Sequence, residues 1–69
     1  MTDEEKQSVV GIHEEIGASQ RKLALLLQTA KATANTEETM ALIHMRKTLV
    51  LLGVAAETIA PLSKTWAHR

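Results

Sequence analysis

Apolar and small residues recur along the first half of the chain at alternating spacings of three and four. The series is Val9, Ile12, Ile16, Ser19, Leu23, Leu26, Ala30 and Thr33. This spacing places the residues on one face of an α-helix that packs against another helix. It predicts a first helix over about residues 3–34. The start is marked by Thr2 and Glu5, which have the spacing of a capping box, and by Asp3 and Glu4 where the helix dipole favours acids.

The same periodicity restarts after residue 36. Its members are Leu42, Met45, Leu49, Leu52, Ala56, Ile59, Ser63 and Trp66. Asn35 tolerates the left-handed conformation that ends a helix, and Thr36 before Glu37 and Glu38 suits a new N-terminus. A turn near 35–36 and a second helix over about 37–60 follow. Pro61 removes a backbone donor and predicts a kink or break, with a short last helical turn at 62–67.

A short connection between two helices predicts one all-α domain over residues 1–69, an antiparallel hairpin. Its arms carry more apolar residues than one shared seam can bury. The surplus on the two arms is Val10, Ala24, Leu25, Leu27, Met40, Ile43, Val50, Leu51, Val54 and Leu62. We therefore expect a homodimer in which two hairpins form a four-helix bundle. The pattern leaves open whether the second arm uses its surplus for self-association or for another partner.

The composition of the chain excludes several classes of function. The chain has 69 residues, eight basic and eight acidic side chains, no cysteine and one aromatic residue. Chains this small need a staple or a partner for stability, and without cysteine neither a disulfide nor a thiolate metal site is available. Zero net charge disfavours bulk electrostatic binding to nucleic acid or membrane.

The localisation expected from the sequence is cytoplasmic. The first six residues are acidic where a secretory signal would be basic. The most apolar run, Leu49 to Leu62, is shorter than the about 20 residues that span a bilayer, and it contains Glu57.

Catalytic and metal-binding patterns are missing, which predicts a non-enzyme without cofactor or metal. His13 opens a His-Glu pair, but the helical zinc motif needs a second histidine at position 17, which is Gly17. His44 and His68 have no better spacing. An antiparallel pairing places His13 near Glu57, where a histidine–carboxylate pair would respond to pH.

The glycines are isolated within helices and build no phosphate loop. A helical glycine usually marks close approach of another backbone. Gly17 opposite Gly53 therefore predicts a tight helix crossing.

Basic residues suggest a second surface. Arg21 and Lys22 lie at nearly the same height of the predicted hairpin as Arg46 and Lys47, with His44 about half a turn away. Such a belt serves either as a solvated face or as a docking patch for an acidic partner.

Trp66 fits the seam, which favours a plug at the open end of the hairpin. Its basic surroundings, Lys64 to Arg69, also suit a binding hot spot.

Two function classes follow. In the first, the chain binds a protein through Val50, Leu51 and Val54, flanked by Arg46 and Lys47, and most plausibly inhibits it. In the second, it is an RNA-binding bundle. Its layout and its Met1-Thr2…Glu5-Lys6 opening resemble the plasmid copy-number regulator that pairs two hairpins to grip kissing RNA loops. The first helix has no aromatic for base stacking, which counts against RNA.

The chain also resembles small phage-encoded anti-activators in length, two-helix pattern and lack of catalytic residues. That resemblance implies a protein that binds a host quorum-sensing transcription regulator and stops it from engaging DNA. Type III secretion co-chaperones have a similar hairpin, which makes a co-chaperone role a further alternative.

Overall fold

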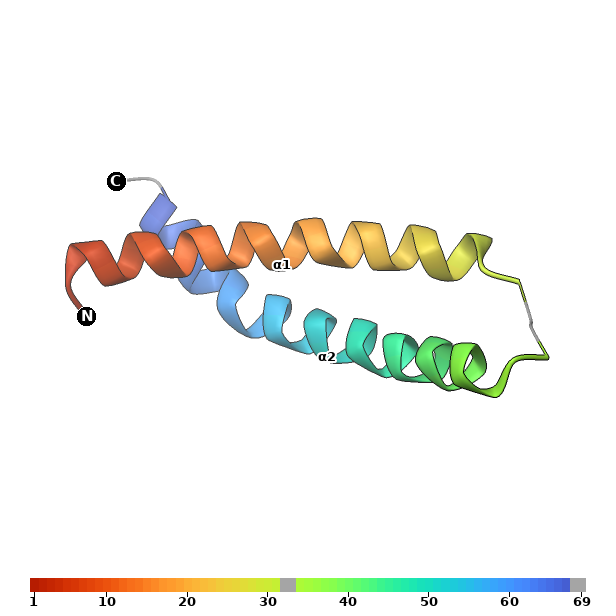
Figure 1. Cartoon of the computed structure of the whole chain (residues 1–69). Helices are drawn as coiled ribbons and strands as arrows, with labels where there is room; N and C mark the ends of the chain where they lie inside the picture. Colours follow the sequence, from red (N-terminus) through yellow and green to blue (C-terminus); the bar gives the residue numbers. More distant parts are fainter. Residues whose placement is uncertain (32–33, 68–69) are drawn as a thin grey trace.

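The computed structural model describes residues 1–31 and 34–67 and contains two long helices, α1 (Asp3–Thr29) and α2 (Thr36–Ala67). They run antiparallel and pack along one another (Figure 1). The molecule is an elongated rod of 50 × 18 × 16 Å. The all-helical hairpin expected from the sequence is confirmed.

The capping box at the start of α1 forms as the sequence predicts. The Thr2 hydroxyl accepts a hydrogen bond from the Glu5 amide at 3.1 Å, and the Glu5 carboxylate accepts one from the Thr2 amide at 2.9 Å. Two amides that the helix leaves without partners are thereby satisfied.

The connection between the helices differs from the prediction. α1 ends at Thr29 rather than near 34, because Ala30 adopts an extended conformation while its amide still donates to the Leu26 carbonyl at 2.8 Å. Asn35 is not left-handed, since no described non-glycine residue has a positive φ. Its side-chain oxygen accepts from the Glu38 amide at 3.0 Å, so Asn35 caps α2. Asparagine is among the best N-capping residues, and this role replaces the predicted one.

Pro61 does not break α2, which continues as helix to Ala67. Of the two outcomes predicted for Pro61, the break with a separate last turn at 62–67 does not occur, whereas the kink stays a prediction. A proline in a helix removes one hydrogen bond to the carbonyl four residues earlier, here that of Glu57. Glu57 and Pro61 are both exposed, so water can satisfy this carbonyl. Figure 1 shows the blue end of α2 crossing α1 beyond this point.

The face of α2 that contacts α1 is the predicted one. All eight residues of its predicted seam are half-buried or, for Ser63, buried. On α1 the face that contacts α2 is rotated about the helix axis relative to the predicted seam. Every seventh residue beginning at Val9 is half-buried, whereas Ile12, Ser19 and Leu26 are exposed. His13, Gln20 and Leu27 are half-buried in their place.

The hairpin contains no buried apolar side chain in the part of the chain that the structure describes. Ser63, with 4% of its surface exposed, is the buried residue there. Two helices make only one line of contact, which cannot enclose a side chain from all directions. The packing along that line is therefore half-open to solvent throughout.

Among the described residues, α2 is long and apolar enough by length and composition to cross a membrane, and none of its most apolar stretch is buried. The core helix of a soluble protein passes the same test. The longest run in α2 without a charged residue is Thr48–Ala56, about 14 Å long, whereas the hydrocarbon core of a bilayer is about 30 Å thick.

Candidate functional site

An apolar ridge lies on the side of α2 that faces away from α1. Val50 and Leu51 are each 67% exposed and Val54 is 58% exposed, although their neighbours Leu49 and Leu52 are half-buried against α1. The full set, called the α2 ridge below, is Met40, Ile43, Val50, Leu51, Val54 and Leu62. α2 is thus apolar on two opposite sides, only one of which has a partner within the hairpin.

Threonines beside the α2 ridge hide their polar groups. The Thr58 hydroxyl donates to the Val54 carbonyl at 2.9 Å, and the Thr65 hydroxyl donates to the Pro61 carbonyl at 2.9 Å. With its hydrogen donated to its own helix, each hydroxyl no longer offers a donor to solvent. The apolar character of this side of α2 therefore extends beyond the ridge residues themselves.

A second apolar surface runs between the helices on one side of the hairpin. It consists of two open cavities of about 280 and 460 Å³ that share Leu26. The first, nearer the interhelical connection, is lined by Leu26, Ala30, Lys31, Glu38, Ala41, Leu42 and Met45. The second is lined by Ser19, Lys22, Leu23, Leu26, Thr48 and Leu52. Together they form what is called the interhelical groove below.

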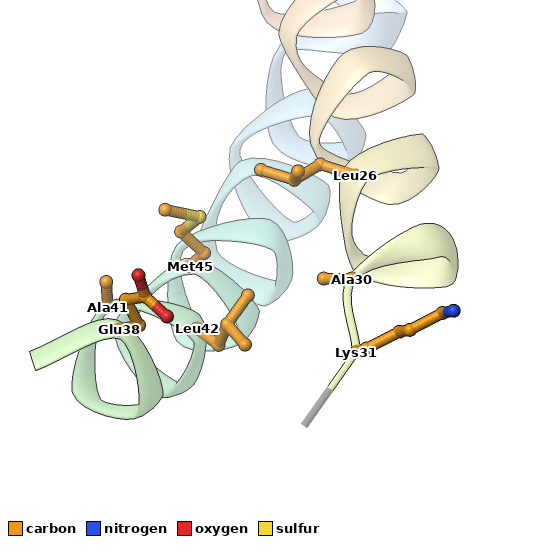
Figure 2. A pocket seen from close by; sticks show the side chains of 7 residues that line it. All are labelled: Leu26, Ala30, Lys31, Glu38, Ala41, Leu42 and Met45. Carbon is orange, nitrogen blue, oxygen red and sulfur yellow. The ribbon is translucent and has the colours of Figure 1, made fainter. Parts of the chain in front are cut away.

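Figure 2 shows how the first cavity is built. Leu26 extends from α1 toward α2 and Leu42 extends from α2 toward α1, while Lys31 points away from α2. In the second cavity the Thr48 hydroxyl donates to the His44 carbonyl at 2.9 Å, so this side chain also adds little polarity. The groove is apolar along its floor, and its charged residues carry both signs.

The interhelical groove was not anticipated from the sequence. Its signal was nevertheless present in the exposed positions Ile12, Ser19 and Leu26, which recur every seven residues and belong to the predicted seam. A seam wider than one helix can cover indicates a second packing partner. The structure separates the two halves of that seam: one is half-buried, and Ser19 and Leu26 of the other border the groove.

The four basic residues of the predicted belt lie at similar heights but on different surfaces. Lys22 and Thr48 line the same cavity, which puts Lys22 within about one helical turn of Arg46 and Lys47 along the hairpin. Lys22 borders the groove. Arg21, Arg46, Lys47 and His44 are exposed and line neither cavity.

Trp66 is half-buried at the end of the hairpin opposite the connection. Its main-chain carbonyl accepts a hydrogen bond from the Gln7 side chain at 3.2 Å, and the Lys6 ammonium lies 5.9 Å from the centre of its ring. This placement matches the predicted plug. The remainder of the basic tail, His68 and Arg69, lies outside the described residues, as does Thr33 of the first seam.

Two finer predictions about the helix contact are not met. No hydrogen bond or ion pair joins His13 to Glu57 between the described portions of α1 and α2. A methyl group added at Gly53 would meet only the Gln20 side chain at 3.7 Å, at Gly17 only Arg21 of the same helix at 3.5 Å, and at Gly11 nothing within 4 Å. Close backbone approach therefore does not explain these glycines.

Within residues 1–31 and 34–67, no three histidine, aspartate or glutamate side chains are grouped so that they could hold a metal ion. The surfaces that this molecule offers are thus the apolar ridge and groove and the basic residues beside them.

Comparison with known protein families, with characterised proteins and with solved structures finds no match to this chain. The chain's own residues and surfaces are therefore what supports a functional proposal.

Proposed function

We propose that this chain is a small, non-enzymatic regulatory protein that binds another protein through the α2 ridge and inhibits it by covering the bound surface. The observation that carries the proposal is the exposure of the ridge. Scattered exposed apolar residues are normal on soluble proteins, whereas six large ones on one side of a single helix indicate an interaction site.

The spacing of the ridge suits a helix that lies in a groove of its partner. Ile43, Val50 and Val54 are separated by seven and four residues, so they project from the same side of α2, and Leu51 widens that side. This is the arrangement of anchors in helix-in-groove recognition. Such a contact needs a preformed apolar groove in the partner and no chemistry from this chain.

The basic residues next to the α2 ridge indicate what kind of partner surface it suits. Arg46 and Lys47 precede Val50 by one turn and are exposed, so an acidic rim on the partner's groove would meet them. Charges at the rim of an interface mainly raise the association rate and its salt dependence. We therefore propose a partner with an apolar groove and an acidic rim. The resemblance to anti-activators extends the proposal to a DNA-binding transcription regulator, in the cytoplasm.

Self-association is part of the same proposal. The hairpin alone buries no described apolar side chain, and a four-helix assembly of two copies would supply the missing enclosed core. In such an assembly each copy presents its own α2 ridge, so that the inhibitor is bivalent.

The experiment uses the full chain immobilised as bait, with each captured protein then purified and its affinity measured directly. Val54→Glu places a charge in the ridge and is expected to weaken binding more than tenfold, equivalent to about 1.4 kcal/mol. Arg46→Glu is expected to slow association. Gln28→Glu, at an exposed position on α1, is the matched control and leaves binding intact.

Three outcomes would contradict the proposal. One is unchanged affinity of Val54→Glu for every captured protein. Another is ridge-dependent binding of the chain to anionic phospholipid vesicles in place of any protein. The third is a gel shift with structured RNA that weakens steeply with salt, which would restore the RNA-binding alternative.

A further inference from the structure

The hairpin has two apolar surfaces on which a second copy of the chain can pack: the interhelical groove and the α2 ridge. We infer that the second copy packs on the interhelical groove and leaves the α2 ridge free. The inference rests on the self-association in the proposed function and specifies its surface, but it does not depend on what the α2 ridge binds, because the two surfaces lie on different sides of the hairpin.

The exposed area of the hairpin is too large for a self-sufficient monomer. The chain exposes 5364 Å², whereas a compact monomer of 7.6 kDa exposes about 4,300 Å². Its radius of gyration is 15.5 Å, against about 11 Å for a compact domain of this length. The exposed area exceeds that of a compact monomer by about 1,100 Å². A stable interface buries about 800 Å² or more per partner, so an interface with a second copy is of the size that would remove this excess.

The groove is the surface that a helix pair can fill. Leu23 and Leu26 line it from α1, and Leu42, Met45 and Leu52 line it from α2. A second hairpin laid over it would cover the exposed Leu26 and enclose the other four side chains, which are half-buried, from the remaining direction. The ridge belongs to α2 alone and projects outward, so a copy placed there would leave the groove open and the contact between α1 and α2 half-exposed.

The pattern on α1 points the same way. Ile12, Ser19 and Leu26 recur at intervals of seven, which is the repeat of a helix that packs in a supercoiled bundle. These residues are exposed in the hairpin, and two of them line the groove. A helix of a second copy is the partner that this repeat fits.

The charged residues beside the interhelical groove indicate that a second copy of the chain occupies it, rather than a strongly acidic or strongly basic partner. The groove is bordered by Lys22 from α1, by Lys31 in the connection after α1 and by Glu38 from α2. A two-fold axis brings each surface against itself, so an interface with both signs can match its own image. A strongly acidic or strongly basic partner would instead leave one of these charges opposed by a like charge.

The test begins with the mass of the full chain by light scattering coupled to size exclusion. We expect twice 7.6 kDa for the wild type, and the same for Val54→Glu, which alters only the ridge. Leu26→Glu, in the shared wall of the two cavities, is expected to elute as a monomer. A monomeric wild type, or a monomeric Val54→Glu beside a dimeric Leu26→Glu, would overturn the inference.

Because Leu26→Glu can also lose its helical structure, a second measurement uses milder variants. The chain has no cysteine, so Ser19→Cys in the groove and Thr58→Cys beside the ridge each provide a single thiol. Raising the protein concentration is expected to slow the reaction of the Ser19→Cys thiol with N-ethylmaleimide several-fold and to leave Thr58→Cys unchanged. Equal reactivity at all concentrations, or protection of Thr58→Cys alone, would contradict a groove-mediated dimer.

Discussion

The side-chain amide of Gln7 donates a hydrogen bond to the main-chain carbonyl of Trp66 at 3.2 Å and so joins two residues 59 positions apart. Gln7 lies in the first turns of α1 and Trp66 in the last turn of α2. The carbonyls of a last turn have no partner within their own helix. The bond therefore satisfies a helix end and fixes the two termini of the hairpin together.

Replacing Gln7 with alanine should lower the free energy of unfolding by about 0.5–1 kcal/mol, because one intramolecular hydrogen bond is lost. Thermal unfolding followed by circular dichroism measures this effect. Trp66 is the one aromatic residue, so its fluorescence reports the same end of the molecule and should shift toward that of exposed tryptophan. Gln28→Ala, which removes a side chain without such a bond to α2 in the described structure, should leave the emission unchanged.

Hydrogen bonds from the Thr2 main chain, and next from the Thr2 side chain, hold the pKa of the Glu5 carboxyl below its ordinary value of 4.5. Since the folded pKa is lowered, ionised Glu5 stabilises the helix start above pH 4.5, and this contribution is lost as the pH falls through the lowered pKa. Thr2→Ala should raise the pKa of Glu5 toward 4.5 and cost about 1 kcal/mol of stability.

A titration of the Glu5 carboxyl by nuclear magnetic resonance checks this prediction. Ser8→Ala is the control, because the Ser8 hydroxyl donates to the Glu4 carbonyl at 3.1 Å rather than to Glu5. Thr2→Ala keeps the main-chain donor, so an identical Glu5 titration in wild type and Thr2→Ala would show that the Thr2 side chain makes no contribution to the lowered pKa.

Gly11→Ala should stabilise the protein by about 0.5–1 kcal/mol. Gly11 lies inside α1 without a positive φ, and an added methyl group meets nothing within 4 Å. Glycine in a helix costs this much relative to alanine because the unfolded chain is more flexible. Chemical denaturation measures the change, and Ala24→Gly should produce the opposite effect in the same helix. A destabilised Gly11→Ala would mean that another chain approaches the helix at this point.

Pro61→Ala should stabilise α2 by about 1–3 kcal/mol, because the Glu57 carbonyl regains a main-chain donor. The Trp66 emission should stay at its wild-type wavelength, since the helix already continues through Pro61 to Ala67. A loss of stability together with a shifted emission would instead indicate that proline sets the direction in which α2 approaches Gln7.

Local interactions were predictable because they depend on neighbours in the sequence. The capping box of Thr2 and Glu5 formed as expected, since its partners are three residues apart. The contact face of α2 was predictable because the apolar series with the regular spacing of three and four residues is the one that packs against α1. Asn35 was assigned the wrong role because asparagine suits both a helix end and a helix start, and the hydrogen bond to Glu38 decides between them.

The contact face of α1 was harder to predict because the seam is shared between two surfaces. Val9, Ile16 and Leu23 are half-buried, whereas Ile12 and Leu26, which have the same periodicity, are exposed. Spacing alone cannot tell which half of a wide apolar stripe meets the nearest helix. The tolerance of α2 for Pro61 was missed for a related reason, since the cost of a lost hydrogen bond depends on whether water reaches the carbonyl.

The position of the Gln7–Trp66 contact has a consequence for the folding rate. In most helical hairpins the turn brings its neighbours together first, so that early contacts close a short loop. Here the side-chain bond from Gln7 to Trp66 joins residues 59 positions apart, whereas Ala30 and Lys31, at the start of the connection, border an open cavity. Closing the longer loop costs about 2 kcal/mol more in chain entropy than closing six residues. The hairpin should therefore fold more slowly than its short connection suggests, and a linker joining its two termini should accelerate folding.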